Sequence, residues 1–437
     1  MRFVSTRGGS VAGLSQALRQ GAAPDGGLYL PEFVPAADLS SLGADMALAP
    51  FAAAMLAPFF ASDALEDQLG AICAEAFDFP APLVVPDASN PGLRALELFH
   101  GPTGAFKDFG ARFLLGCFDR QDEQLTVLAA TSGDTGGAVG CAAEGRGGVR
   151  AVILYPRGRV SPFQALQLGC WGAPVQAIEV DGDFDDCQAL VKSAFADLAL
   201  SRAHRLTSAN SINIGRLLPQ MAYLGRAALQ LHAETGKAPG LIVPTGNLGH
   251  GFAAFYARAM GLPIGPIVLA TNANATLADW AANGAFRPRP SVATLANAMD
   301  VGAPSNFERL AALTPGRGPV DVELVGDDAI RERIAGDFAE SGRIWCPHSA
   351  VAAEAYARLE APRREERPWM VCATAHPYKF AEIVEPLIGA KVTPPPALAA
   401  ILDRAAVATP IAADLGALAR ALDASAGNER FEIEDAA

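Results

Sequence analysis

The sequence lacks the patterns that would assign it to several common classes of protein. Its seven cysteines include no CxxC pair, so neither a zinc site nor a disulfide framework is indicated. Its 34 basic residues are outnumbered by 47 acidic ones, and an acidic chain repels nucleic-acid phosphates. No hydrophobic signal segment opens the chain. We therefore expect a cytoplasmic protein with reduced thiols and with no nucleic-acid, membrane or metal partner.

One uncharged run, residues 46–62, is Ala-rich, is interrupted by Pro50 and Pro58, and is shorter than the roughly 20 apolar residues that a membrane span needs. We expect it to form a buried helix. The whole chain has 437 residues, of which 51% are apolar and 19% charged. That length predicts two or three domains. A Pro-rich connector near Pro86 predicts a small N-terminal unit over residues 1–85, with helices near Val11–Gln20 and Asp63–Phe77.

Beyond this connector, apolar strand-like runs alternate with amphipathic helices. The expected strands are Leu125–Ala130, Val149–Tyr155, Val175–Val180, Leu241–Pro244, Ile267–Thr271 and Trp369–Thr374. The expected helices are Gly136–Glu144, Pro162–Leu168, Asp185–Leu198, Asn213–His232, Gly249–Met260 and Ala329–Ser341. This alternation predicts an α/β fold with a parallel sheet covered on both faces, in which ligands bind at the carboxyl ends of the strands.

A lysine stands among small and aromatic residues in the segment FHGPTGAFKD, residues 99–108. One interpretation of Lys107 is an ordinary surface lysine. The other is a Schiff-base lysine. A free lysine, with a pKa of about 10.4, is almost wholly protonated at pH 7, and condensation with an aldehyde cofactor removes that handicap. The same amine, once released, can act as a base at the reacting carbon.

A Gly-rich turn connects a strand to a helix in LIVPTGNLGH, residues 241–250. Gly246 and Gly249 would let the backbone approach an anion, and amides at the helix start would bind a phosphate. Many strand–helix turns contain two glycines, so this motif alone is weak. It is neither a Walker loop nor a GxGxxG motif, which disfavours a dinucleotide.

Two further segments follow predicted strands. In ATSGDTG, residues 130–136, hydroxyls and amides at a helix start could hold a carboxylate, or could simply cap the helix. In VCATAHP, residues 371–377, the hydroxyl of Thr374 could face the ring nitrogen of a cofactor, or could be a capping group; His376 is interpreted as structural. Together, the four segments suit a pyridoxal phosphate bound to an α-amino acid.

These segments resemble the threonine synthase family. STRG at residues 5–8 and PDGGLY at residues 24–29 resemble its opening, and HGPTGAFKDFG resembles its cofactor-lysine segment. The segments TSGDTGGA, YPRGRVSPFQALQL, NSINIGRLLPQ, PTGNLGH and TAHPYKF then follow in the family's order. The resemblance covers nearly the whole chain and is to the bacterial and fungal branch of the tryptophan synthase β-like superfamily.

The resemblance implies a fold type II architecture of two lobes plus a small N-terminal domain. It implies a catalytic region over residues 86–390, with a mobile smaller lobe at about 110–209, and a C-terminal segment, 391–437, packed on the larger lobe. The implied cofactor is pyridoxal 5′-phosphate, with its phosphate on the Gly246–Gly249 turn, its ring nitrogen beside Thr374 and its 3-hydroxyl near Asp134. The residues expected at the cofactor are Lys107, Asp134, Gly246, Asn247, Leu248, Gly249, His250 and Thr374.

The implied reaction is loss of phosphate from O-phospho-L-homoserine followed by addition of water, which gives L-threonine. Arg159 and Arg216 are candidates for the leaving phosphate, because a guanidinium donates two parallel hydrogen bonds; either could instead form a structural ion pair. The residues expected at the substrate are Thr131, Ser132, Thr135, Arg159, Ser161, Asn213 and Arg216. The role of His250 stays open, and no chemistry is assigned to Cys346.

Two alternatives share parts of this interpretation. A phospho-lyase of the same fold would stop after the elimination and give 2-oxobutyrate, ammonia and phosphate. A catalytically silent relative would carry a damaged lysine loop or phosphate turn, and neither is damaged in this sequence. We expect a monomer or a homodimer.

Overall fold

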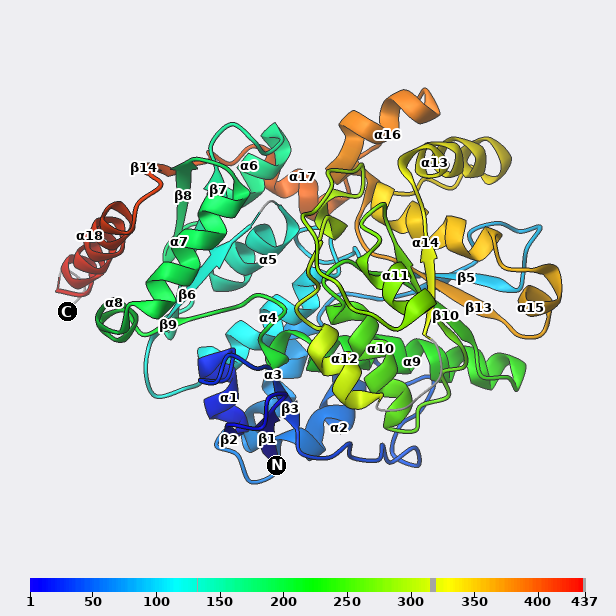
Figure 1. Ribbon diagram of the computed structural model, residues 1–437, viewed down its shortest axis with the longest axis horizontal. Coiled ribbons are helices and arrows are strands. Elements are labelled where there is room, and N and C mark those ends of the chain that lie inside the picture. Colours follow the sequence, from blue (N-terminus) through cyan, green and yellow to red (C-terminus); the bar gives the residue numbers. More distant parts are fainter. Residues whose placement is uncertain (132, 315–319, 435–437) are drawn as a thin grey trace.

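The strands of this computed structural model, which describes residues 1–131, 133–314 and 320–434, form three sheets. A small antiparallel sheet belongs to the N-terminal region, and a six-stranded and a five-stranded sheet form the two halves of the rest (Figure 1). Helices cover the two larger sheets. The prediction of an α/β fold with parallel sheets flanked by helices is confirmed.

The N-terminal sheet has the order β2-β1-β3, with β1 at Arg2–Ser5, β2 at Val11–Gly13 and β3 at Tyr29–Pro31. The prediction of one helix over Val11–Gln20 is therefore wrong at its start: Val11 pairs with Val4 of β1, and helix α1 (Leu14–Gln20) begins only after Gly13. Pairing with β1 decides the conformation of these three residues, because cross-strand contacts override a weak local preference.

The rest of the N-terminal region is helical. Helix α2 (Leu48–Phe60) buries Phe51, Phe59 and Phe60, which confirms a buried helix within residues 46–62. The helix expected at Asp63–Phe77 is shorter: a 3-10 turn, η1 (Glu66–Gln68), leads into α3 (Leu69–Ala76). The Asp63 carboxylate instead accepts hydrogen bonds from the backbone and hydroxyl of Ser15, so it holds α1.

The six-stranded sheet has the order β12-β11-β10-β13-β5-β4, and only its edge strand β4 runs antiparallel. Its strands are β4 (Leu83–Val84), β5 (Leu93–Glu97), β10 (Gly240–Pro244), β11 (Ile267–Thr271), β12 (Asp321–Leu324) and β13 (Trp369–Ala373). Strand β5 was not expected, because its sequence LRALE favours helix. Its register with β13, from Leu93↔Trp369 to Glu97↔Ala373, makes it a strand.

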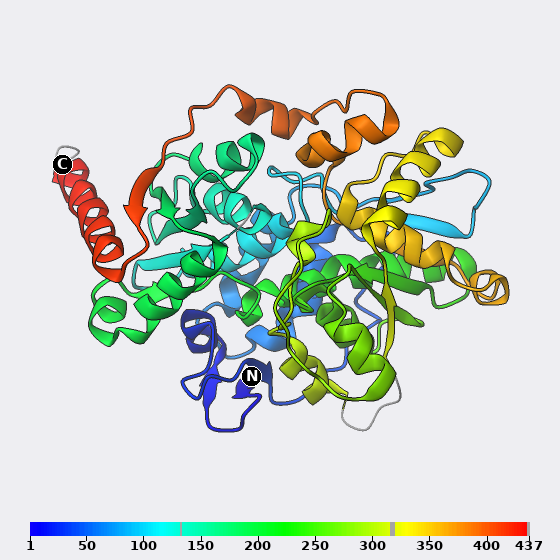
Figure 2. The ribbon, with the colours of Figure 1, turned by 45° about the horizontal axis from the view of Figure 1, so that its top comes forward.

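The five-stranded sheet is wholly parallel, with the order β14-β8-β7-β6-β9. Its strands are β6 (Leu125–Ala130), β7 (Val149–Pro156), β8 (Val175–Asp181), β9 (Leu206–Thr207) and β14 (Thr409–Ala412). The C-terminal segment, residues 391–437, was expected to pack on the larger lobe; Val392 does lie in the core of that lobe, but the later part of the segment joins the five-stranded sheet instead. Figure 2 shows it passing from α16 (Ala381–Ile388) across to β14, which pairs with β8. Open edge groups of β8 provide the hydrogen bonds that a tail strand can use.

The remaining helices connect and cover these strands. They are α4 (Lys107–Phe118), α5 (Asp134–Ala143), α6 (Pro162–Gly169), α7 (Phe184–Ala196), α8 (Leu198–Ala203), η2 (Ile214–Arg216), α9 (Leu218–Thr235), α10 (Gly249–Ala259), α11 (Thr276–Asn283), η3 (Asn297–Met299), α12 (Phe307–Leu313), α13 (Asp327–Ser341), α14 (Pro347–Ala357), α15 (Ala361–Glu365), η4 (Pro377–Phe380), α17 (Pro396–Leu402) and α18 (Leu415–Glu434).

Two of the expected helices differ from the structure at their ends. The helix expected from Asn213 to His232 is the 3-10 turn η2 followed by α9, with Pro219 near the start of α9, where proline fits. The helix expected at Asp185–Leu198 is α7, which ends at Ala196, because the Asp197 side chain accepts hydrogen bonds from the amides of Ala199 and Leu200 and so begins the next helix, α8.

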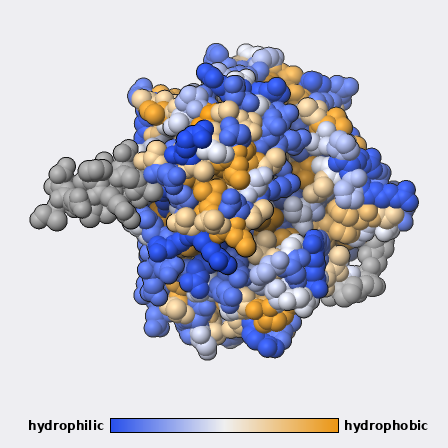
Figure 3. Space-filling view, turned by 60° about the vertical axis from the view of Figure 1, so that its left-hand side comes forward, coloured by the Kyte–Doolittle hydropathy of each residue, from blue (hydrophilic) through white to orange (hydrophobic). Residues whose placement is uncertain are grey.

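The surface shows no continuous apolar band on the face seen in Figure 3, where hydrophobic residues stand in small groups among hydrophilic ones. Within the described residues, no helix is both long enough and apolar enough to cross a membrane. All seven cysteines are free thiols, in agreement with the prediction of reduced cysteines.

Candidate active site

The lysine loop, residues 98–106, connects β5 to α4 and is joined to the segment after β13. The Phe106 amide donates to the Thr374 carbonyl at 2.8 Å, and Ala105 forms an isolated bridge with Ala375. The amide of His376 donates to Gly104, whose φ of +68° favours glycine. All four chemistry-bearing segments therefore follow strands, because the unexpected strand β5 precedes the lysine loop.

Lys107 is the first residue of α4 and keeps some exposure. Its ammonium lies 5.2 Å from the centre of the Phe106 ring. Burial lowers the pKa of Lys107 to about 8 against the opposing attraction of Asp134, and the cations Arg216 and Lys379 lower it further. An amine with such a pKa is partly neutral near pH 8, so it can attack a carbonyl.

Asp108, which sequence reasoning left without a role, shapes the lysine loop. Its buried carboxylate accepts hydrogen bonds from the Thr103 amide at 2.9 Å and the Thr103 hydroxyl at 2.6 Å. Burial raises the pKa of Asp108 to about 6, although both hydrogen bonds from Thr103 oppose the rise. A Cβ on Gly101 would lie 2.5 Å from the same carboxylate, so this loop has no room for a larger residue.

The Gly-rich turn between β10 and α10 has the geometry of an anion cradle. Leu248 adopts a left-handed conformation, with φ of +62°, and its side chain is fully buried. The Asn247 side chain donates to the Ser211 hydroxyl at 2.7 Å and accepts from the Ser305 amide at 2.6 Å, which fixes the turn from two sides. The first amides of α10 are without carbonyl partners inside the helix, so they are available to an anion.

A buried arginine supports this cradle from behind, and sequence reasoning missed it. Arg309 donates to the carbonyls of Tyr29, Ser211 and Ile212 and to the side chain of Asn306. Asn306 in turn donates to the Asn247 carbonyl at 3.0 Å. Burial lowers the pKa of Arg309 to about 9, with Glu308 opposing. The N-terminal region and the cradle are thus connected through one side chain.

His250, in the first turn of α10, is buried with both ring nitrogens lacking a hydrogen-bond partner in the described structure. Its ring stacks on Phe106 at 4.8 Å and meets Tyr223 edge-on at 5.7 Å. Burial lowers the pKa of His250 to about 3, and Lys107 contributes to the lowering. His250 is therefore a neutral ring that offers one donor and one acceptor beside the lysine.

Thr374 lies immediately after β13 and is buried. Its amide donates to the Ser349 hydroxyl at 3.0 Å, and that hydroxyl lies 3.1 Å from the Cys346 sulfur. The same sulfur accepts the Ser349 amide and so caps α14. Cys346, to which the sequence assigned no chemistry, therefore orients the serine that orients Thr374.

Asp134, the first residue of α5, forms a buried ion pair with Lys379 at 3.1 Å. Burial opposes its ionisation, but Lys379 and then Lys107 outweigh it and hold the pKa of Asp134 below its usual value. Lys379 belongs to the TAHPYKF segment, which the sequence singled out without assigning this residue.

Four of the residues expected at the substrate carry a hydroxyl group: Thr131, Ser132, Thr135 and Ser161. The Thr131 hydroxyl accepts hydrogen bonds at 3.1 Å from the amides of Gly133, the N-cap of α5, and of Gly136 in its first turn, so it holds the turn that begins this helix. Ser161 caps α6 in a capping box with Gln164. Thr135 is partly exposed, and Ser132 lies outside the described residues. The starts of α5 and α6 lie next to each other, since a Cβ on Gly133 would lie 2.9 Å from the side-chain nitrogen of Gln164.

The two candidate arginines differ in their surroundings. Arg159 is exposed after β7 and forms no ion pair within the described structure. Arg216 is buried under α4, donates to the Ala209 carbonyl and has an unpartnered Nε; burial lowers its pKa to about 10. Asn213 is fully buried; its side-chain nitrogen donates to the carbonyls of Leu18 and Ser208, and its side-chain oxygen accepts from the Gly215 amide. This saturation gives Asn213 a structural role, in place of the substrate contact that was expected.

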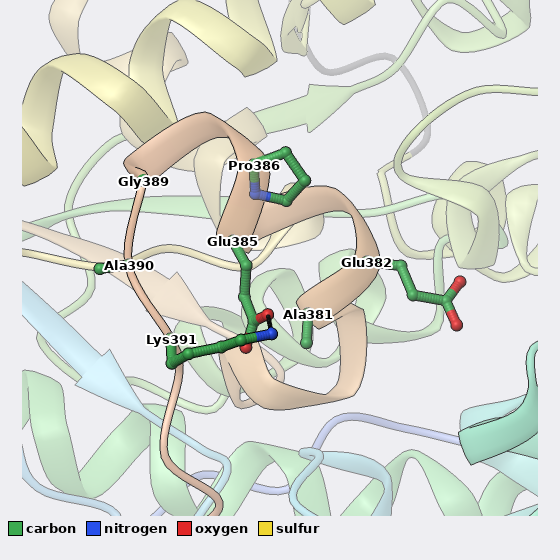
Figure 4. A pocket seen from close by; sticks show the side chains of 7 residues that line it. All are labelled: Ala381, Glu382, Glu385, Pro386, Gly389, Ala390 and Lys391. Carbon is green, nitrogen blue, oxygen red and sulfur yellow. Dashed lines mark hydrogen bonds and ion pairs between the residues drawn. The ribbon is translucent and has the colours of Figure 1, made fainter.

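A surface cavity of about 360 Å³ lies elsewhere, along α16. Figure 4 shows the Lys391–Glu385 ion pair within it, at 2.5 Å. None of its lining residues belongs to the site around Lys107, so it contributes nothing to this chemistry.

The residues around Lys107 fit the phosphorylated aldehyde cofactor that the sequence implies. They combine an amine whose pKa is near 8, a turn with available amides, and a buried histidine whose two nitrogens lack partners. A hydroxyl side chain at Thr374 completes the set at the end of the neighbouring strand β13.

Comparison with known proteins agrees with this fit. Residues 79–374 match the family described as pyridoxal-phosphate dependent enzyme. Residues 2–77 match the threonine synthase N terminus, and residues 349–421 match the threonine synthase C-terminal family. The threonine synthase of Serratia marcescens is 38% identical over 426 residues, covering 95% of each chain. That of Escherichia coli is 38% identical over 412 residues, covering 92% of this chain and 95% of its own.

Solved structures agree with the sequence comparison. The crystal structure of threonine synthase from Escherichia coli has a TM-score of 0.87 at 35% identity, covering 97% of this chain and 99% of that one. A structure of pyridoxal-phosphate-bound threonine synthase from Brucella melitensis has a TM-score of 0.88 at 35% identity, with the same coverage. An aspartate racemase, with a TM-score of 0.53 at 18% identity, shares the fold alone.

Proposed function

The chain belongs to the threonine synthase family, and on that basis we propose that Lys107 is the residue that carries its cofactor, pyridoxal 5′-phosphate. Its reaction is that of a threonine synthase: O-phospho-L-homoserine loses phosphate and takes up water to give L-threonine. The observation that carries the residue assignment is the joining of the lysine loop to the segment of Thr374, with the Gly-rich turn beside it through the stacked Phe106 and His250.

Each residue has a part that follows from its position. When bound, the cofactor supplies an electron-withdrawing ring that makes the α proton of the substrate acidic. We assign the amides of Gly246, Asn247, Leu248 and Gly249 to its phosphate, and the Thr374 hydroxyl to its ring nitrogen. A hydroxyl, unlike a carboxylate, leaves that nitrogen neutral. The Ser349–Cys346 pair holds Thr374 in place for this contact.

Lys107 has a second part as a base, because its amine is free while substrate is bound. With a pKa of about 8, a substantial share of the amine is neutral at physiological pH and can accept the α proton. His250, neutral and unpartnered, we assign to the cofactor side of the same space. We assign Thr131, Thr135 and, from its place in the sequence alone, Ser132 to the substrate carboxylate, and Arg159 and Ser161 before α6 to its phosphate.

Replacement of Arg159 by alanine is expected to weaken substrate binding without harming the fold. Because Arg159 is exposed and forms no ion pair in the described structure, only the substrate phosphate loses a partner. Loss of a charge-assisted contact predicts a rise of about tenfold in KM. Steady-state kinetics with phosphohomoserine would measure this, with Arg157→Ala, on the same loop, as the matched control. An unchanged KM in Arg159→Ala would remove this residue from the phosphate site.

Arg216, the second candidate for the substrate phosphate, differs from Arg159 in the expected effect of its replacement by alanine. Since it is buried, bonded to the Ala209 carbonyl and packed against Gly110, its loss should lower stability first. We therefore place the phosphate at Arg159 and treat Arg216 as part of the support beneath α4.

The products distinguish the proposed reaction from the phospho-lyase alternative, since both begin with the same loss of phosphate. NMR of the purified protein with phosphohomoserine is expected to show threonine and phosphate in equal amounts. Accumulation of 2-oxobutyrate and ammonia in place of threonine would favour the alternative. Inorganic phosphate alone does not discriminate, so the carbon product must be followed.

Three further assignments stay proposals. We propose a cytoplasmic location, which the seven free thiols support, and a monomer or homodimer without a nucleic-acid partner. We also propose that the smaller lobe, about residues 110–209, moves against the larger one. The five-stranded sheet supports this division, since four of its strands, β6 to β9, lie inside that range.

A further inference from the structure

Lys379 is a buried cation at the site for which the scheme above has no role. It lies in η4, just after β13, and its side chain is 2% exposed. Its ammonium donates to the Thr103 carbonyl at 2.7 Å and to the Gln167 side-chain oxygen, and it pairs with Asp134 at 3.1 Å. A lysine that is buried this completely must be held by partners such as these, because an isolated buried charge is very unfavourable.

The partners of Lys379 come from both halves of the molecule. Thr103 belongs to the lysine loop, which follows β5 of the six-stranded sheet, whereas Asp134 and Gln167 belong to α5 and α6, which flank the five-stranded sheet. The Gln167 amide donates to the same Thr103 carbonyl at 3.1 Å. Lys379 and Gln167 therefore fasten the α5–α6 side of the site to the loop that carries Lys107.

The charges around Lys107 give this contact a chemical consequence. Asp134 is the anion that attracts its ammonium, and Arg216 and Lys379 are the cations that repel it. Burial lowers the pKa of His250 to about 3 and that of His348 to about 4, so both rings are neutral. The Asp108 carboxylate is engaged with Thr103. Asp134 is therefore one carboxylate that attracts two ammonium groups, and its direct contact is with Lys379.

We propose that Lys379 is a positioning residue for Lys107: it occupies Asp134 and holds α5 and α6 against the lysine loop, so that the Lys107 amine is not locked in an ion pair. A lysine left alone with a buried carboxylate stays protonated, and a protonated amine neither attacks an aldehyde nor accepts a proton. A second cation beside it has the opposite effect. This inference deepens the role proposed for Lys107 and rests on it.

The test is the protonation of Lys107 in the full chain stripped of cofactor, measured by competitive acetylation at a series of pH values with peptide mass spectrometry. In Lys379→Met, Lys107 loses a repelling cation and becomes the only ammonium group that can pair with Asp134. The pH at which its acetylation is half complete, its labelling midpoint, should therefore rise by about one pH unit or more. In Asp134→Asn, the attracting anion is lost and the midpoint should move down. Lys379→Arg, which keeps the charge, should lie nearer to the wild-type protein than Lys379→Met does. Lys391→Met, at an exposed lysine, is the control and should leave the midpoint unchanged.

A folding defect in Lys379→Met would not end the test. The double variant Asp134→Asn with Lys379→Met removes both members of the buried pair and leaves no unpaired charge between them. Compared with Asp134→Asn alone, it isolates the repulsion by Lys379, so its Lys107 midpoint should be higher. Equal midpoints in these two variants, or an unchanged or lowered midpoint in folded Lys379→Met, would overturn the proposal.

Failure of this inference can be told apart from failure of the proposed function. Acetylation reports the Lys107 amine without cofactor or substrate, so it does not depend on turnover. Whether Lys107 carries the cofactor is decided separately, by the absorbance of the reconstituted enzyme.

Discussion

Lys107→Ala is expected to lose the visible absorbance of the lysine-bound cofactor together with threonine formation. In the role proposed for it, the amine would link covalently to the cofactor and would serve as the base during turnover, so the substitution removes two functions at once. A fall in kcat of about 10³-fold or more follows from the base alone. Lys107 begins α4, and alanine favours helix, so the helix should persist. Absorbance spectra after reconstitution and a threonine assay are the measurements.

The control for this prediction is Lys391→Ala, which removes an exposed lysine paired with Glu385, far from the lysine loop in sequence and in the lining of another cavity. It should keep both absorbance and activity. A Lys107→Ala protein that still shows a lysine-type absorbance would mean that another lysine carries the cofactor. Lys379 would then be the first to consider, since it is a buried lysine of the same site.

Gly246→Ala is expected to weaken cofactor binding at least about tenfold and to lower kcat/KM by about 10–100-fold. A Cβ at this position would lie 2.6 Å from the Met299 Cα and 2.8 Å from its carbonyl oxygen. Both contacts are with backbone, so no side chain can turn away, and the turn that bears the cradle amides must shift. The expected result is a higher dissociation constant for pyridoxal phosphate, measured by titration of the stripped protein.

The matched control is Gly336→Ala, within α13, where a Cβ would meet nothing within 4 Å. This change should leave cofactor affinity unchanged and should stabilise the helix slightly, because alanine favours helix over glycine by about 1 kcal/mol. If Gly246→Ala binds cofactor as tightly as the wild-type protein while its fold is intact, the phosphate does not sit on this turn.

Much of the site could be predicted from the sequence because its residues lie in short contiguous segments. The Gly-rich turn, the Asp134 loop and the Thr374 segment each follow a strand that the sequence predicts, and the lysine loop is marked by a lysine among small and aromatic residues. The order of these segments was enough to indicate the family. Strands β6, β7, β10, β11 and β13 could also be predicted from the sequence, since each is a buried apolar run.

Other features depend on residues distant in the sequence, and no local pattern encodes them. The LRALE segment becomes β5 only because β13 lies beside it, and residues 409–412 become a strand only at the open edge of β8. Arg309 contacts the cradle through Asn306. The side-chain nitrogen of Asn213 donates both of its hydrogen bonds to carbonyls that lie 195 and 5 residues away in the sequence. Composition and propensity cannot show which polar groups will be saturated, because the partners are chosen by packing.

The sequence by itself determined the family, the fold class and the cofactor, and it singled out Lys107 for the proposed role, because these follow from the type and order of residues within short segments. Only the tertiary structure decided what surrounds that lysine: Asp134 paired with Lys379, a neutral His250 with no hydrogen-bond partner among the described residues, and Arg216 buried beneath α4. The reason is physical. Burial and the distances between charges from different elements set a pKa, and neither quantity exists until the two halves of the molecule have come together.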